Sequence, residues 1–248
     1  MAMARAYVED AYTTGHQVSL CWALYAACPV ALAVGDLATA ERFETTLRER
    51  SSRHAPGFLQ ALAYGLQGEL SIKRGAVDGG VQRLRSALDE LRASGFVLRR
   101  PALLGALAEG LAAAGRVAEG LQAIKEAFTQ CVRSEELWNV AELLRIEGEL
   151  LRLEGTKEAI AAAEDRFLQA LGWARRQEAS SWELRCATGL ALLLNDQQRV
   201  AEAHRLLSAA YDLFTEGFET ADLKAAKALL DALADAPARQ RVTDGCRL

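Results

Sequence analysis

Apolar runs with charged residues at helical spacing follow one another along the chain and end at regular intervals. The residues that mark these ends are 40 positions apart: Gly35, Gly75, Gly115, Gly155 and Asn195. Glycine and asparagine tolerate the left-handed backbone conformation that closes a helix. The column therefore predicts an internal repeat in which each unit closes a helix at the same tight turn.

Small residues keep the same spacing on both sides of this turn. Seven positions before it stand Cys28, Gly68, Ala108, Gly148 and Thr188. Five positions after it stand Ala40, Gly80 and Gly120, and Ala163 and Ala201 are the expected equivalents in the last two units. Small side chains let two helices approach closely, so each unit is predicted to be a helix A and a helix B that cross at these positions.

The pattern predicts the approximate bounds of every helix. The expected A helices are 19–34, 58–74, 101–114, 136–154 and 181–194. The expected B helices are 37–52, 77–93, 117–132, 158–177 and 197–215. A further column, Gly15, Ala55 and Gly95, falls where B helices end.

One helix pair of this size cannot bury its apolar face, whereas stacked pairs can. The predicted fold is therefore all-α, a right-handed α-α superhelix (solenoid) of about five 40-residue hairpins with flanking helices, in a single array over 1–234. Its parts are a partial repeat at 4–15, repeats at about 19–55, 56–95, 96–135, 136–178 and 179–217, a terminal helix at 221–234 and a mobile tail at 235–248. Because residues 4–14 resemble a B helix without its A helix, we expect a fragment of a longer protein.

Composition and charge narrow the class of protein. With 51% hydrophobic and 25% charged residues, the chain has the composition of a soluble folded protein. A net charge of −4 argues against direct nucleic-acid binding, and no apolar run approaches the roughly 20 residues of a membrane span. Five scattered cysteines without a CxxC pair favour reduced, buried thiols and a cytoplasmic location.

The sequence lacks the motifs of common catalytic and metal sites. There is no phosphate-binding loop, no GxSxG and no HExxH, and His16, His54 and His204 lie far apart. We therefore predict a non-enzymatic chain with no catalytic, cofactor-binding or metal-ligating residues and no cofactor. Arg83, Arg85, Arg92, Arg99 and Arg100 are expected to form a solvated surface.

The unit resembles the tetratricopeptide repeat, which has a small residue, a glycine seven positions later and an alanine five beyond that. The turn "GDLATAE" at 35–41 matches this pattern best. Longer strings, among them 15–43, 141–155, 180–194 and 211–233, resemble the C-terminal repeat region of bacterial regulators built on signal-transduction ATPases of the STAND type. Members of that family carry a winged-helix DNA-binding domain or a nucleotide-cyclase domain before the ATPase, so the parent protein would carry domains absent from this chain.

The tetratricopeptide resemblance implies a concave groove lined by the A helices. Taking each turn residue as position fifteen transfers the groove positions to this chain. The implied groove residues are Trp22, Tyr25, Pro29, Glu69, Lys73, Glu109, Glu142, Arg145, Glu149, Arg152, Trp182 and Arg185. The groove would have an aromatic N-terminal end, a ladder of glutamates at 40-residue spacing and a mixed-charge C-terminal end.

Two alternatives stay open for these residues. Glu69, Glu109 and Glu149 either contact a ligand or are solvated and structural, and Arg145 either faces a ligand or pairs with Glu149 four positions away. Pro29 lies inside a predicted helix, where it removes a hydrogen bond to the Tyr25 carbonyl. It either shapes a pocket or only adjusts the curvature of the array.

The predicted function is that of a protein- or effector-binding regulatory module of a larger bacterial transcriptional regulator or signalling ATPase. The expected partner is a protein or peptide, the upstream ATPase domain of the same polypeptide, or a small-molecule effector. Neither nucleic acid nor a membrane is expected as a partner. The alternative is a self-association scaffold, in which the partner is a second copy in a homodimer and there is no effector.

Overall fold

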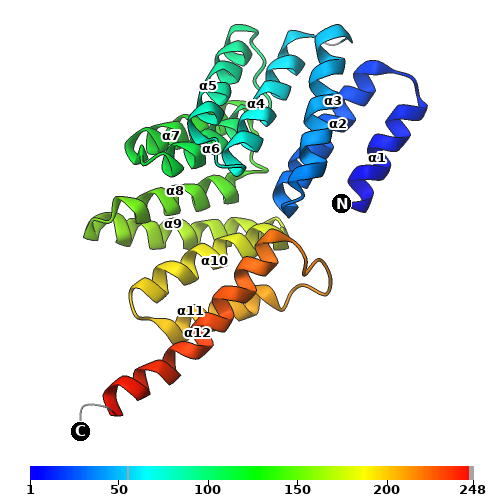
Figure 1. Ribbon diagram of the computed structural model, residues 1–248. Coiled ribbons are helices and arrows are strands. Elements are labelled where there is room, and N and C mark those ends of the chain that lie inside the picture. The colour runs from blue at the N-terminus through cyan, green and yellow to red at the C-terminus, as the bar shows by residue number, and fades with distance from the viewer. Residues whose placement is uncertain (55, 246–248) are drawn as a thin grey trace. The chain divides into compact units, whose positions relative to one another are not determined.

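The computed structural model describes residues 1–54 and 56–245, and these residues form helices and connecting turns (Figure 1). The helices in chain order are α1 Ala2–Thr13, α2 Gln17–Val34, α3 Leu37–His54, α4 Gly57–Lys73, α5 Val77–Ala93, α6 Arg100–Ala113, α7 Val117–Ser134, α8 Val140–Glu154, α9 Lys157–Arg176, α10 Ser180–Asp196, α11 Val200–Tyr211 and α12 Ala221–Gly245. The predicted all-α class and the succession of helical hairpins are confirmed, and every predicted A and B helix is present.

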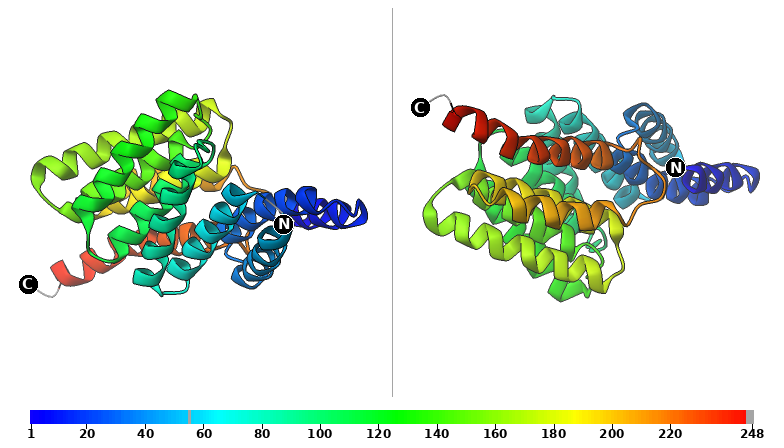
Figure 2. Two further views of the ribbon diagram at one scale, coloured as in Figure 1. Left: turned by 90° about the horizontal axis from the view of Figure 1, so that it is seen from above. Right: turned by 90° about the horizontal axis from the view of Figure 1, so that it is seen from below.

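The chain divides into two compact units, Met1–Leu137 and Trp138–Leu248. In unit 1 each helix from α1 to α6 contacts the next one in the chain, and the A helices α2, α4 and α6 also contact one another in sequence. In unit 2 the hairpins α8–α9 and α10–α11 pack in the same way, with α12 against α10 and α11. Figures 1 and 2 show these hairpins side by side within each unit.

The predicted turn column is confirmed in four of its five members. Gly35, Gly75, Gly115 and Gly155 have φ angles of 82°, 86°, 73° and 75°, in the left-handed region. Asn195 is the exception, because it lies inside α10 and Gln198 adopts the left-handed conformation with a φ of 64°. The turn is therefore displaced by three residues in the fifth unit.

This displacement begins in α9, which has 20 residues, whereas α5 has 17 and α7 has 18. The left-handed residue that follows α9 is Glu178, with a φ of 53°, whereas its equivalent after α7 is Glu135, with a φ of 54°. This turn is displaced by three residues from the 40-residue spacing, so the small residue at the fifth helix crossing is Ala191 rather than Thr188. Ala191 is completely buried, while the Thr188 hydroxyl is half-buried and donates to the Leu184 carbonyl of its own helix.

The crossing of α4 and α5 shows why the small columns exist. A Cβ on Gly68 would lie 2.9 Å from the Gly80 carbonyl oxygen, and a Cβ on Gly80 would lie 2.7 Å from the Gly68 carbonyl oxygen. The two backbones are thus close enough that side chains at these positions would collide. The prediction that small residues mark the A–B crossing is confirmed here.

The start of α8 and the end of α12 differ from the sequence prediction. α8 begins at Val140 rather than 136, because Glu136 to Asn139 belong to the preceding turn. α12 continues past the predicted end at 234 to Gly245, and its Ala, Arg and Gln residues are good helix formers. The predicted mobile tail, 235–248, therefore overlaps α12. Residues 246–248 of this tail lie outside the described residues, and so does Ala55, which was predicted to mark the end of a B helix.

One described helix is long and apolar enough, by length and composition, to cross a membrane. It is α2, and half of its 18-residue window is buried inside the protein. The expectation that no segment approaches this length is therefore corrected for α2. Its contacts with α1, α3 and α4 account for its apolar character as that of a core helix.

Candidate binding site on the A helices

Two predicted groove glutamates of unit 1 lie at a common pocket of about 210 Å³. Glu69 and Lys73 come from α4 and Glu109 comes from α6, and the apolar side chains Ile72 and Ala106 complete the lining. The spacing of 40 residues brings the two carboxylates together because α4 and α6 are neighbouring A helices. Three of the residues predicted from the repeat pattern are therefore gathered in one place.

The Glu69 carboxylate is half-buried and has no hydrogen bond or ion pair within the part of the chain that the structure describes. Burial raises its pKa from 4.5 to about 7. The charge of Lys73 opposes this rise, Glu109 adds to it, and Arg99 opposes it. Glu69 therefore titrates in the neutral range, and an additional positive charge would favour its ionised form.

Replacing Glu69 with glutamine is expected to remove a pH-dependent loss of stability. Below pH 4.5 both the folded and the unfolded chain carry a protonated Glu69, so the group has no effect there. As the pH rises toward about 7, the unfolded state loses the proton first, and the free energy of unfolding falls by on the order of 2 kcal/mol. Urea unfolding at several pH values should show Glu69→Gln gaining stability relative to the wild type across this window.

The matched control is Glu41→Gln, because Glu41 is exposed and its pKa is lowered by a hydrogen bond from Arg74. This control should show no gain at neutral pH. Parallel pH profiles for Glu69→Gln and the wild type would contradict the assignment of a raised pKa to Glu69.

An arginine that sequence analysis assigned to the solvated surface lies beside this pocket. Arg99 has a φ of 68°, uncommon for a residue with a Cβ, and its backbone N–H donates to both carboxylate oxygens of the buried Glu136 at 3.0 and 2.9 Å. Its guanidinium lies 5.4 Å from the ring centre of Tyr25, and its Nε donates to the Tyr25 hydroxyl at 3.1 Å. Glu136 thus holds Arg99 in a conformation that places positive charge on the A helices.

Arg100 also departs from the expected solvated surface. Its side chain is only 8% exposed and lies 3.7 Å from Glu126, and its Nε has no hydrogen-bond partner among the described residues. Burial lowers the pKa of this guanidinium, and Arg92 adds to the effect. In the sequence, the only signal for Arg99 and Arg100 was their position at the predicted start of an A helix.

The aromatic end predicted for the groove is present in unit 1 and larger than expected. Trp22 packs edge-on against Tyr25 and also contacts Phe58, which stacks on Phe96 at a centroid distance of 4.4 Å. Tyr25 is buried, and burial raises its pKa to about 12. Pro29 lies within α2, which continues to Val34, so the helix is maintained across the proline.

The residues predicted for the mixed-charge end of the groove lie in unit 2 and pair with one another. Glu142 accepts hydrogen bonds from Arg145 at 2.9 and 3.0 Å and is 2.9 Å from the guanidinium of Arg185. Asp222 of α12 approaches Arg185 at 3.9 Å. The structure thus joins three predicted groove residues in one ion-pair network, to which α12 contributes a carboxylate that sequence analysis missed.

Glu149 pairs with Arg152 at 3.1 Å rather than with Arg145 as one sequence alternative held, and Arg152 also reaches Asp196 at 3.3 Å. Trp182 stacks on Trp138 with ring centres 5.8 Å apart. Because of the three-residue displacement, Trp182 and Arg185 do not occupy the repeat positions from which they were predicted. In unit 2 the predicted groove residues are therefore occupied mainly with one another.

Charged side chains on the B helices pair between neighbouring repeats. Arg85 and Arg92 of α5 reach Glu119 and Glu126 of α7 at 2.7 and 2.9 Å. Exposed pairs of this kind contribute little stability, typically about 0–1 kcal/mol. In each of these pairs a positive side chain lies beside a negative one, whereas the carboxylate of Glu69 has no such partner among the described residues.

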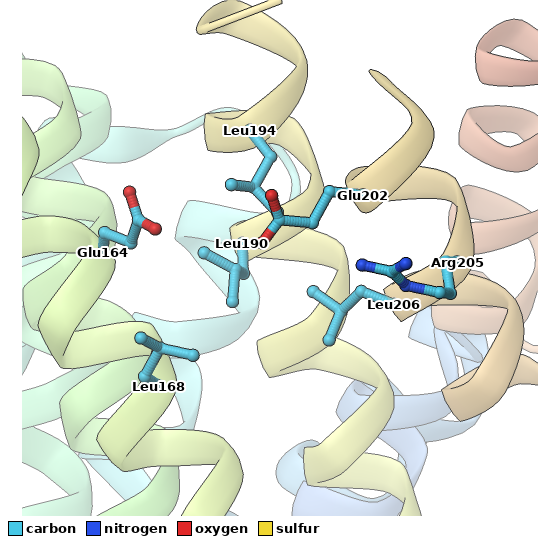
Figure 3. A pocket seen from close by; sticks show the side chains of 7 residues that line it. All are labelled: Glu164, Leu168, Leu190, Leu194, Glu202, Arg205 and Leu206. Carbon is cyan, nitrogen blue, oxygen red and sulfur yellow. The ribbon is translucent and has the colours of Figure 1, made fainter. Parts of the chain in front are cut away.

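Unit 2 has a pocket of about 190 Å³ between α9, α10 and α11 (Figure 3). Leu190 and Leu194 of α10 lie between Leu168 of α9 and Leu206 of α11. Glu164 and Glu202 also line it, and Arg199 bonds to both carboxylates. Its two carboxylates are thus already neutralised within the protein.

The described residues include no group of three or more His, Cys, Asp or Glu side chains placed to hold a metal ion. Cys21, Cys28, Cys131 and Cys186 are buried free thiols, and Cys246 lies outside the described residues. Burial raises the pKa of Cys131 to about 11 and that of Cys186 to about 12. These thiols are therefore protonated at neutral pH and poor nucleophiles.

No protein-family model matches the chain, and no curated protein matches it. Among solved structures, BtubC (BKLC) from P. vanneervenii aligns with a TM-score of 0.56 at 16% identity over 97% of this chain and 90% of its own. The apo form of RapI aligns with a TM-score of 0.55 at 12% identity over 90% of this chain. A signal transduction ATPase with numerous domains (STAND) from Pyrococcus horikoshii, described as having a tetratricopeptide repeat sensor, aligns with a TM-score of 0.50 at 12% identity over 90% of this chain.

The chain spans 60% of the length of RapI and 38% of the STAND protein. At these identities the likeness shows the fold alone, which is a tetratricopeptide-like stack of helical hairpins. Such repeat domains are generally protein-binding modules and are typically non-catalytic.

Proposed function

We propose that this chain is a non-enzymatic regulatory module that binds a protein, peptide or effector through its A helices. The observation that carries the proposal is that charged side chains on the B helices of unit 1 are paired, whereas a carboxylate on its A helices is not. Charges on α5 and α7 pair with one another, whereas Glu69 of α4 lies unpartnered at a pocket beside a strained Arg99. Strained backbone and groups with perturbed titration concentrate at functional sites.

The proposed setting is a larger bacterial transcriptional regulator or signalling ATPase in the cytoplasm. Support comes from the sequence resemblance to repeat regions of STAND regulators and from the fold shared with one STAND sensor protein. The buried free thiols agree with a reducing compartment. In this setting the upstream ATPase of the same polypeptide is a candidate partner, and ligand uptake on the A helices would alter that contact.

The test is selection of a displayed random-peptide library on the purified chain, followed by hydrogen exchange with and without an enriched peptide. We expect the added protection to fall on α2, α4 and α6 in unit 1 or on α8 and α10 in unit 2. The B helices provide the internal control, because they unfold with the same units but do not line the proposed surface. Protection confined to α3, α5 or α7, or a library that enriches no peptide, would contradict the proposal.

Self-association remains the second candidate, and one observation favours it. α1 exposes three large side chains, with Met3 86%, Tyr7 52% and Tyr12 48% exposed. Exposed apolar groups that gather on one helix invite association with another copy. Sedimentation velocity over a range of concentrations distinguishes the two candidates, since a monomer at every concentration would exclude a scaffold built on this contact.

A further inference from the structure

The pocket between α4 and α6 is lined by two carboxyl groups and one ammonium group. Glu69 of α4 and Glu109 of α6 contribute the two carboxyl groups, and the exposed Lys73 contributes the ammonium group. Arg99 also acts on Glu69 by its charge, and it bonds to Tyr25 through its Nε. A cation placed beside Glu69 and Glu109 would be attracted by both carboxylates and would favour the ionised form of Glu69.

The rest of the lining is apolar and firmly held. Ile72 fills the space left by two glycines of adjacent helices, since a Cβ on Gly80 or Gly110 would lie 2.5 Å from its side-chain carbons. Ala106 lines the opposite wall from α6. A surface of this kind suits an aliphatic chain and does not suit a hydrated inorganic ion.

The two properties together describe one kind of ligand group. Lysine and arginine carry a long aliphatic stem that packs on apolar surface and a charged end that seeks carboxylates. The pocket volume of about 210 Å³ suits one such side chain and is too small for a folded element. A cation on an extended peptide could enter from the surface, because Lys73 at the rim is exposed.

We propose that this pocket receives a lysine or arginine side chain of a peptide partner, with the cationic end between Glu69 and Glu109 and the stem on Ile72 and Ala106. The assignment rests on the proposed function, because it names the partner chemistry of the same A-helix surface. Bound in this way, the cation supplies the partner that the Glu69 carboxylate lacks within the described residues.

Binding of a cation is coupled to release of a proton from Glu69. The charged and titratable groups that face Glu69 are Lys73 on its own helix, Glu109, Arg99, and Tyr25 and Cys28 of α2. Tyr25 and Cys28 have pKa values raised by burial and stay neutral near pH 7. Because the ligand favours the ionised form of Glu69, its affinity should increase as the pH rises through about 7.

The experiment compares two pools of short fluorescein-labelled peptides that are identical at their random positions. The central position is lysine in one pool and norleucine in the other, which keeps the aliphatic stem and removes the charge. Fluorescence anisotropy is measured for the wild type and for the double variant Glu69→Gln/Glu109→Gln. The matched control is Glu41→Gln/Glu119→Gln, which removes the same charge from two exposed, ion-paired glutamates of unit 1.

We expect the wild type and the control variant to bind the lysine pool about tenfold more tightly than the norleucine pool, a difference of about 1.4 kcal/mol. The preference should be lost in Glu69→Gln/Glu109→Gln and should weaken in the wild type below neutral pH. Equal binding of the two pools, mapped by hydrogen exchange to α4 and α6, would overturn the cation assignment and leave the proposed function intact. A lysine preference that persists in the double variant would also overturn it, and failure of both pools to bind would contradict both proposals.

Discussion

Phe167→Ala is expected to lower the free energy of unfolding of unit 2 by about 3–5 kcal/mol, as removal of a fully buried aromatic ring typically does. Phe167 is 0% exposed and reaches from α9 toward both A helices of unit 2. Its ring fills the space above two glycines, since a Cβ on Gly148 would lie 3.0 Å from the ring and one on Gly189 would lie 2.6 Å from it. Loss of the ring leaves a cavity that the rigid helix pairs cannot close.

Urea unfolding monitored by tryptophan fluorescence measures this effect. A Trp22→Phe background leaves only Trp138, Trp173 and Trp182, all in unit 2, as reporters. The matched control is Leu168→Ala, the next residue of the same helix, which is 52% exposed and should change stability by less than about 1 kcal/mol. Similar losses for the two variants would contradict the assigned packing.

The same contact predicts a change of sign in a double variant. Gly148→Ala should destabilise the wild type, because the three atoms nearest to the new Cβ are ring carbons of Phe167 at 3.0–3.1 Å. In the Phe167→Ala background that clash is absent, so the added methyl should be neutral or stabilising through helix propensity. If Gly148→Ala destabilised the wild type and the Phe167→Ala variant by the same amount, the clash with the Phe167 ring would not be the reason for the glycine.

Gly80→Ala is expected to destabilise unit 1 by about 3 kcal/mol, the upper part of the usual range for overpacking. The new methyl would lie 2.7 Å from the Gly68 carbonyl oxygen and 2.5 Å from Ile72. A backbone carbonyl cannot rotate away as a side chain can, so α4 and α5 would have to separate. Hydrogen exchange on α4 and α5 should report faster opening of this helix pair.

The neighbouring glycine of α5 provides the control. A Cβ on Gly79 meets only the flexible end of Arg83, at 2.9 Å, so Gly79→Ala should be stabilising by roughly 0.5–1 kcal/mol. The two variants change the same residue type by one methyl at adjacent positions. Equal effects in both would contradict the close approach of α4 and α5 at Gly80.

The fold was predictable because its determinants are local and repeated. A left-handed turn favours glycine, as at Gly35, Gly75, Gly115 and Gly155, and close helix crossing needs small residues at Gly68 and Gly80. The displacement in the fifth unit was less visible, because the two or three additional residues of α9 do not disturb its own periodicity. Gln198, which has no special tolerance for a positive φ, takes the turn because the packing of α10 places it there.

The candidate site was predictable only in part. The 40-residue spacing correctly brought Glu69 and Glu109 to one pocket, since equivalent positions on stacked A helices are neighbours. The choice of ion-pair partners was not predictable, because Arg145 can reach glutamates on either side of it along the helix and pairs with Glu142. In the structure Glu149 pairs with Arg152, and Glu142 also receives Arg185 from another helix of unit 2.

By itself, the sequence determined the helical hairpin, its turn and the crossing points, because backbone conformation and close approach depend on residues within one repeat. Only the tertiary structure decided the raised pKa of Glu69, the strained Arg99 held by Glu136, and the aromatic contact between Phe58 and Phe96. Burial, charge pairing and ring stacking join residues from different helices. Their outcome is therefore set by the packing of one repeat on the next.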